Sequence, residues 1–169
     1  MKKRYIIITL FLFFIFEGTV FRLISPDFYG SIISLFPRFV LVLIILISIF
    51  RNRKYGLFLG IGFGLLYDIV YGNVIGVYMV GMAGVGYFSG WLIQFLHPTL
   101  LVYLLIEFVG LFLFELFLYS MLRLYKLTYL PLDTAIVTLI LPSIIFNLVF
   151  AIFIYIPAHY LIEKKGISD

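Results

Sequence analysis

Long apolar runs, each about as long as a lipid bilayer is thick, make up nearly all of this sequence. A helix needs about 20 apolar residues to cross the hydrocarbon core. Six runs approach this length, over about residues 5–24, 32–50, 55–71, 74–96, 99–122 and 134–162. Because lipid cannot satisfy the polar groups of an open backbone, each run is expected to be a helix. The sequence therefore predicts an all-α integral membrane protein, with six transmembrane helices in one compact bundle and a single domain over residues 1–169.

The composition supports a lipid environment and excludes several kinds of site. Of the 169 residues, 64% are hydrophobic and 12% are charged, whereas a soluble domain is about half apolar and a quarter charged. The absence of cysteine excludes disulfides and thiolate metal ligands. The sequence also lacks the motifs of zinc proteases, serine hydrolases and phosphate-binding loops. We therefore expect no enzyme activity, no cofactor and no metal site.

The basic residues indicate how the chain is oriented. They give a net charge of +4 but lie in short clusters at the ends of the apolar runs, so no nucleic-acid partner is expected. With both chain ends in the cytoplasm, the inner basic residues outnumber the outer ones by eight to four, as the positive-inside rule requires. The inner set is Lys2, Lys3, Arg4, Arg51, Arg53, Lys54, Lys164 and Lys165, and the outer set is Arg22, Arg38, Arg123 and Lys126.

Ten of the fourteen glycines lie in one segment, from Tyr55 to Gly90. Small residues four apart let two helices approach closely. The third run carries three glycines at this spacing and the fourth carries a pair; they are Gly56, Gly60, Gly64, Gly86 and Gly90. Two interpretations are open: internal packing of the third helix against a neighbour, or a docking face for another membrane protein.

A single acid, Asp68, interrupts the glycine-rich segment near its predicted outer end. It precedes Gly72 by four residues, which is about 6 Å of helix. Asp68 is therefore expected to cap the turn formed by Gly72, Asn73 and Gly76, or to accept hydrogen bonds from the start of the fourth helix. The alternative is a polar contact with a partner or ligand on the outer side.

Four further polar side chains are expected to be buried inside the spans: Glu17, Glu107, Glu115 and Asn147. Acids in lipid are costly and usually have a partner. Arg22 or Arg38 is expected to neutralise the acid in the first helix. As a group, the buried polar residues favour hydrogen bonds between helices over a proton or cation path, because no string of polar residues links the two sides of the membrane.

The prolines and one acid predict local features of the second and sixth helices. Pro37 suits the first turn of the second helix or a kink within it. Pro142 and Pro157 should bend the long sixth helix. Asp133 is well placed as the N-cap of that helix.

The segment Gly60-Ile-Gly-Phe-Gly-Leu-Leu-Tyr-Asp68, continuing to Gly72 and Gly76, resembles the rod shape-determining MreD family. The chain length, the order of the spans and Pro37 at the start of the second span also fit. Arg38 departs from the resemblance, because the family more often carries an acid, an amide or another uncharged residue there. The specific motif covers only about residues 56–90.

This resemblance implies a non-enzymatic subunit of the bacterial cell-elongation complex in the cytoplasmic membrane. Such a protein would bind MreC directly and link MreB filaments to the peptidoglycan polymerase and transpeptidase, with a homo-oligomer as an open possibility. The family fold is thought to be similar to the six-helix substrate-binding subunits of energy-coupling-factor transporters. A second hypothesis is therefore a vitamin-type binding subunit of a transporter, which needs convergent polar groups in an outward pocket.

Overall fold

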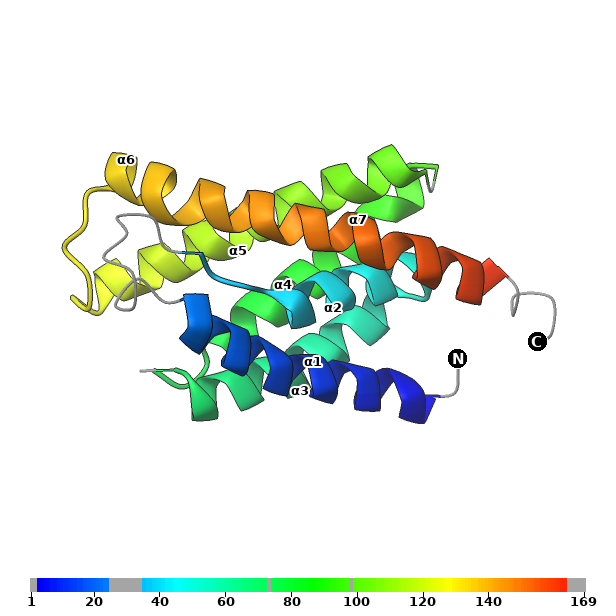
Figure 1. The fold of residues 1–169 in the computed structure, drawn as a ribbon, viewed down its shortest axis with the longest axis horizontal. Helices are drawn as coiled ribbons and strands as arrows, with labels where there is room; N and C mark the ends of the chain where they lie inside the picture. Colours follow the sequence, from blue (N-terminus) through cyan, green and yellow to red (C-terminus); the bar gives the residue numbers. More distant parts are fainter. Residues whose placement is uncertain (1–2, 25–34, 73, 98, 164–169) are drawn as a thin grey trace.

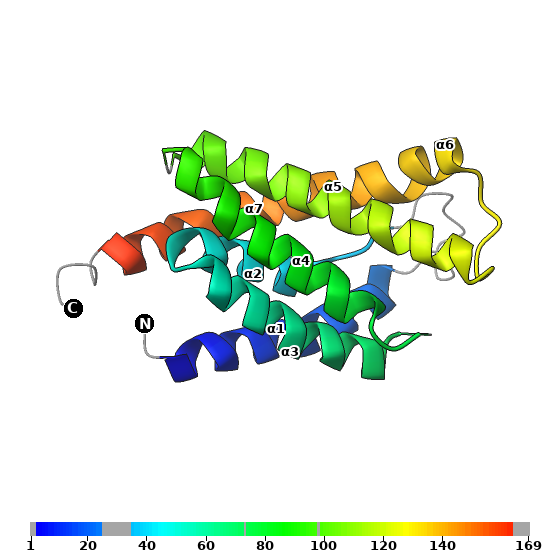
Figure 2. The same ribbon diagram turned by 180° about the vertical axis from the view of Figure 1, so that it is seen from behind.

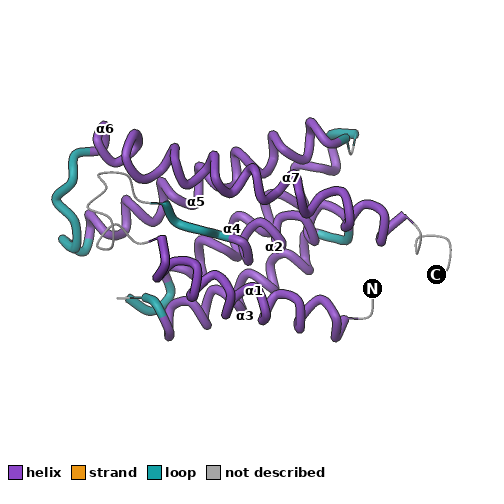
Figure 3. Tube along the Cα trace, viewed as in Figure 1, coloured by secondary structure: helices purple, strands orange, loops and turns teal. Residues whose placement is uncertain are grey.

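The computed structural model describes residues 3–24, 35–72, 74–97 and 99–163, and this part of the chain is helical without any strand (Figure 3). The helices are α1 (Lys3–Ile24), α2 (Phe39–Phe50), α3 (Arg53–Val70), α4 (Val77–Leu92), α5 (Leu100–Leu124), α6 (Leu132–Ala135) and α7 (Leu141–Glu163). A short 3₁₀ turn, η2 (Ile93–Phe95), follows α4, and a π-helical stretch, η3 (Ile136–Ile140), joins α6 to α7. The prediction of an all-helical fold is confirmed.

Helix α2 lies at the centre of the bundle. It contacts α1, α3, α4, α5 and α7, and every side chain from Phe39 to Leu46 is buried. In Figure 1, α5 and α7 lie above it and α1 and α3 lie below it. Figure 2 shows the same order from behind, with α4 crossing between α3 and α5. Helix α1 begins and α7 ends at the same end of the molecule (Figure 1).

Two helices in the described part of the chain are long and apolar enough to cross a membrane. They cover Leu100–Leu124 and Leu132–Pro157, and α2 is a shorter apolar helix. The second of the two long helices combines α6, η3 and α7. These lengths are consistent with a membrane protein.

The tight packing of α3 on α4 depends on their glycines. A Cβ atom added to Gly60 would lie 2.5 Å from the Met82 carbonyl oxygen, and one added to Gly64 would lie 2.5 Å from the Cα atom of Met79. In return, a Cβ added to Gly86 would lie 2.6 Å from the Gly56 carbonyl oxygen. The backbone of α4 therefore packs directly against the glycine face of α3. This packing leaves no room for a partner protein on that face.

The last glycine of the predicted set, Gly90, lies where α2, α3 and α4 meet. Its Cβ would be 2.6 Å from the Cα atom of Arg53, and the Ser48 hydroxyl from α2 donates a hydrogen bond to the Gly86 carbonyl. The glycines thus bring three helices together at one end of the bundle. The faces of these five glycines contact the chain itself, as the interpretation of internal packing expects.

Several helix boundaries differ from the predicted ones, and at two of them the difference changes the role of a predicted residue. The second helix begins at Phe39 rather than near residue 32, and Pro37 precedes it in a non-helical stretch over residues 35–38. The sixth helix begins at Leu132, so its N-cap is Pro131 and Asp133 lies in the first turn. The π-helical stretch ends at Ile140, two residues before Pro142, where a proline removes a backbone donor.

Replacing Gly60 with alanine should destabilise the protein by about 1–3 kcal/mol, because the new methyl group overlaps the α4 backbone. Gly62 is the matched control, since it is two residues away on the same helix and its Cβ would meet nothing within 4 Å. Gly62→Ala should leave stability unchanged or raise it by up to about 1 kcal/mol through helix propensity. Unfolding in detergent measures both variants, and equal stability of the two would contradict the packing.

Candidate functional site

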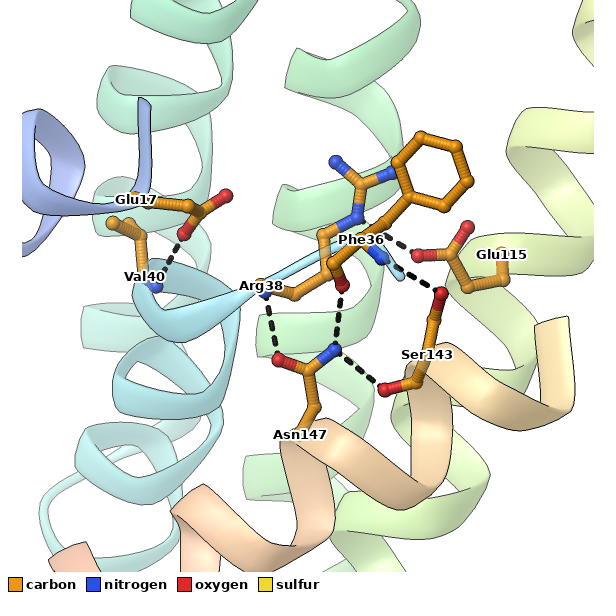
Figure 4. Close-up of polar contacts among 7 residues, drawn as sticks. All are labelled: Glu17, Phe36, Arg38, Val40, Glu115, Ser143 and Asn147. Carbon is orange, nitrogen blue, oxygen red and sulfur yellow. Dashed lines mark hydrogen bonds and ion pairs between the residues drawn. The ribbon is translucent and has the colours of Figure 1, made fainter. Parts of the chain in front are cut away.

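The non-helical segment before α2 is held by side chains of α7. The Phe36 amide donates to the Ser143 hydroxyl at 2.9 Å, and the Arg38 amide donates to the Asn147 side-chain oxygen at 2.7 Å. The Asn147 side-chain amide donates back to the Phe36 carbonyl at 2.9 Å (Figure 4). Buried backbone groups outside a helix need partners, and here two residues one helical turn apart supply them. Asn147 was expected to be buried, whereas Ser143 was missed, although its spacing of four places it on the same helix face.

Glu17 of α1 supports the first turn of α2. Its carboxylate accepts a hydrogen bond from the Val40 amide at 3.2 Å, and Glu17 is 5% exposed. A carboxylate at a helix N-terminus satisfies an otherwise unpaired donor and interacts favourably with the helix dipole. Arg38 lies close enough to attract this carboxylate electrostatically. The side chain of Arg22, the other expected partner, lies outside the described part of the chain.

Arg38 forms a buried ion pair with Glu115 of α5. Its Nε atom donates to Glu115 Oε1 at 2.8 Å, and the two side chains are only 11% and 10% exposed. The guanidinium carbon lies 5.4–5.6 Å from the ring centres of Phe36, Tyr78 and Phe114. Arg38 was counted among the outer basic residues that orient the chain. The structure corrects this interpretation, since its charge is paired inside the bundle.

Asp68 caps the start of α4. Its two carboxylate oxygens accept hydrogen bonds from the amides of Gly76, Tyr78 and Met79 at 2.9, 2.8 and 3.0 Å. The residue is 2% exposed, so it faces its own chain, as the capping interpretation requires. Three donors on one carboxylate hold the end of α3 against the beginning of α4.

The glycines of this connection allow its tight turn. Gly76 has a φ of 104°, a left-handed backbone conformation that residues other than glycine rarely adopt. A Cβ added to Gly72 would lie 2.6 Å from the Asp68 carbonyl oxygen. Asn73, the fourth residue predicted for the turn, lies outside the described residues.

Glu107 is not part of this network. It is fully buried on α5, about 12 Å along the helix axis from Glu115, and neither of its carboxylate oxygens has a hydrogen-bond partner among the described residues. The structure therefore brings Glu17, Glu115 and Asn147 to the segment between Phe36 and Val40, and leaves Glu107 apart.

A cavity of about 220 Å³ lies beside the ion pair, between the segment before α2, α5 and the connection from α3 to α4. Arg38, Glu115 and Tyr119 contribute polar groups to its walls, and most of the remaining lining is apolar or aromatic. Glu115 and Tyr119 accept hydrogen bonds from arginines of the chain itself. Among the described residues, no group of three acids or histidines is placed to hold a metal ion.

Comparisons with known proteins give one consistent result. The model of the rod shape-determining protein MreD family matches residues 2–165. The rod shape-determining protein MreD of Bacillus subtilis is 28% identical over 171 residues, which covers 100% of this chain and 99% of that protein. No solved structure matches the chain.

The ion pair predicts a strong asymmetry between single and double substitutions. Arg38→Met alone should lower the free energy of unfolding by about 3–5 kcal/mol, because it leaves the Glu115 carboxylate buried without its partner. The double variant Arg38→Met, Glu115→Met should recover most of this loss, since neither charge remains. Unfolding of the four proteins in detergent gives the coupling energy, and simple additivity of the two changes would contradict the pair.

Proposed function

The chain belongs to the family of rod shape-determining proteins MreD, and from this premise we propose that it is a non-enzymatic membrane subunit of the bacterial cell-elongation complex. In this role it binds MreC directly and helps couple MreB filaments to the peptidoglycan polymerase and transpeptidase. Family membership over nearly the whole chain supports this proposal.

The proposed topology has six membrane crossings with both chain ends in the cytoplasm. Helices α1, α3, α4 and α5 supply one crossing each, α2 supplies one together with the non-helical residues before it, and the continuous α6, η3 and α7 supply the sixth. An even number of crossings agrees with α1 beginning and α7 ending at the same end of the molecule (Figure 1). With Arg38 removed from the outer set, the charge count favours this orientation by eight to three. A fold similar to the substrate-binding subunits of energy-coupling-factor transporters is part of the same proposal.

The main support for an adaptor role is that most of the buried polar side chains form hydrogen bonds or an ion pair within the chain. Glu17, Asp68 and Asn147 accept hydrogen bonds from the chain's own backbone, and Glu115 pairs with Arg38. These groups hold helices together, so they support a rigid bundle that presents its outer surface to other proteins.

We place the MreC contact on the exposed face of α4. Val80, Gly84, Tyr87 and Trp91 follow one another at helical spacing and are all exposed. A Cβ added to Gly84 would meet nothing within 4 Å, so another helix has room to approach this backbone closely. Small residues favour such contacts between membrane helices.

One observation favours a second candidate function, small-molecule binding. The cavity beside Arg38 combines a guanidinium with aromatic and apolar walls, which suits a carboxylate-bearing compound of the vitamin type. A rise in the melting temperature of the purified protein with such a compound, absent in Arg38→Met, would support binding.

Replacing Gly84 with leucine should reduce co-purification of MreC at least ten-fold, because the side chain blocks close approach to α4. The protein itself should fold normally, since the position is open. Gly62→Leu is the matched control, as Gly62 is equally open but lies on α3. Full recovery of MreC with Gly84→Leu would contradict this docking face.

A second test uses the absence of native cysteines. Single cysteines placed at Val80, Gly84 and Tyr87 should form disulfides with cysteines in the membrane helix of MreC. Crosslinks that instead arise from the opposite side of the bundle, for example from Val137, would place the contact elsewhere.

A further inference from the structure

Helices α1 and α3 touch at one end and diverge at the other. At the middle of α1, the Phe14 ring lies 4.9 Å from the Tyr67 ring and 5.5 Å from the Tyr71 ring, measured between ring centres. Gly18 lies directly against the Tyr71 hydroxyl. Near the beginning of α1, a groove of about 390 Å³ separates the same two helices. The pair of helices is thus closed at one end and open at the other.

The walls of this groove are apolar along their length. Ile6 and Ile7 of α1 form one side, and Phe58 and Leu59 of α3 form the other. Ile7 is 53% exposed and Phe58 is 70% exposed. In a membrane protein, an open apolar groove between two helices faces the hydrocarbon chains of lipid.

Two cations lie at the mouth of the groove, Arg51 and Lys54. Both are exposed, and within the described part of the chain neither forms an ion pair. The guanidinium carbon of Arg51 lies 4.7 Å from the centre of the Tyr55 ring, which positions its charge. Two like charges three residues apart repel each other, and an anion between them removes this cost.

We propose that this groove binds an anionic phospholipid of the cytoplasmic leaflet, with an acyl chain between α1 and α3 and the phosphate between Arg51 and Lys54. The inference rests on the orientation given under the proposed function, which puts this end of the bundle in the cytoplasm. The apolar walls distinguish a lipid from free phosphate, because only a lipid fills the groove. The basic rim distinguishes an anionic lipid from a zwitterionic one.

Native mass spectrometry of the purified protein, titrated with phosphatidylglycerol, tests the proposal directly. The wild-type protein should retain phosphatidylglycerol in preference to phosphatidylcholine. Arg51→Gln, Lys54→Gln should weaken retention on the order of 30-fold, from about 1 kcal/mol for each basic residue near a lipid phosphate. The matched control, Arg123→Gln, Lys126→Gln, removes two positive charges at the C-terminal end of α5, away from the groove, and should retain the lipid fully.

A groove-filling variant tests the position of the acyl chain. Ile7→Trp keeps both cations and should still lower retention, because the larger side chain occupies the groove. Inorganic phosphate and glycerol 3-phosphate should not compete with the lipid. Equal loss in the control pair, full retention in Ile7→Trp, or competition by free phosphate would each overturn the proposal. Lipid retention is measured without MreC, so its outcome is independent of the adaptor role.

Discussion

The structure depends on the hydrogen bonds that the backbone segment before α2 forms inside an apolar bundle. A membrane interior offers no water to unpaired peptide groups, and residues 35–38 are not helical. Ser143 and Asn147 take the place of water and of helical bonds. This anchoring lets α2 begin inside the bundle, where it is the central helix and is buried from Phe39 to Leu46. The segment is thus part of the bundle core.

Three of the four buried acids in the described part of the chain follow the same rule, and Glu107 is the exception. Glu17 bonds to the first turn of α2 and Asp68 caps α4, so each carboxylate satisfies helix N-termini that would otherwise be unpaired. Glu115 neutralises Arg38, whose charge would be costly alone. With these polar groups bonded within the chain, the outer surface is left for partners. The exposed face of α4 and the groove between α1 and α3 are the two places where the proposed contacts lie.

The sequence predicted features that depend on neighbours along the chain, and it missed those that depend on distant residues. The lengths of the apolar runs predicted the helices, and the four-residue spacing of the glycines predicted close packing of the third helix against a neighbour. The family resemblance, based on the Asp68 segment, is confirmed by the match over residues 2–165. The pairing of Arg38 with Glu115 joins residues 77 positions apart, and hydrophobic patterning carries no information about such a partner. The late start of α2 was missed for the same reason, because apolar residues 35–36 fit a helix until their bonds to α7 are known.

Hydrogen exchange at the backbone amides of Phe36, Arg38 and Val40 tests the central claim most directly. These amides should be protected in the native protein, and Asn147→Leu should speed exchange at Arg38 on the order of ten-fold, because the Arg38 amide loses its hydrogen-bond acceptor. The amides of Tyr78 and Met79, bonded to Asp68, serve as internal references and should remain protected. Rapid exchange of the three amides in the unmodified protein would contradict the account, as would an Arg38 amide unaffected by the substitution.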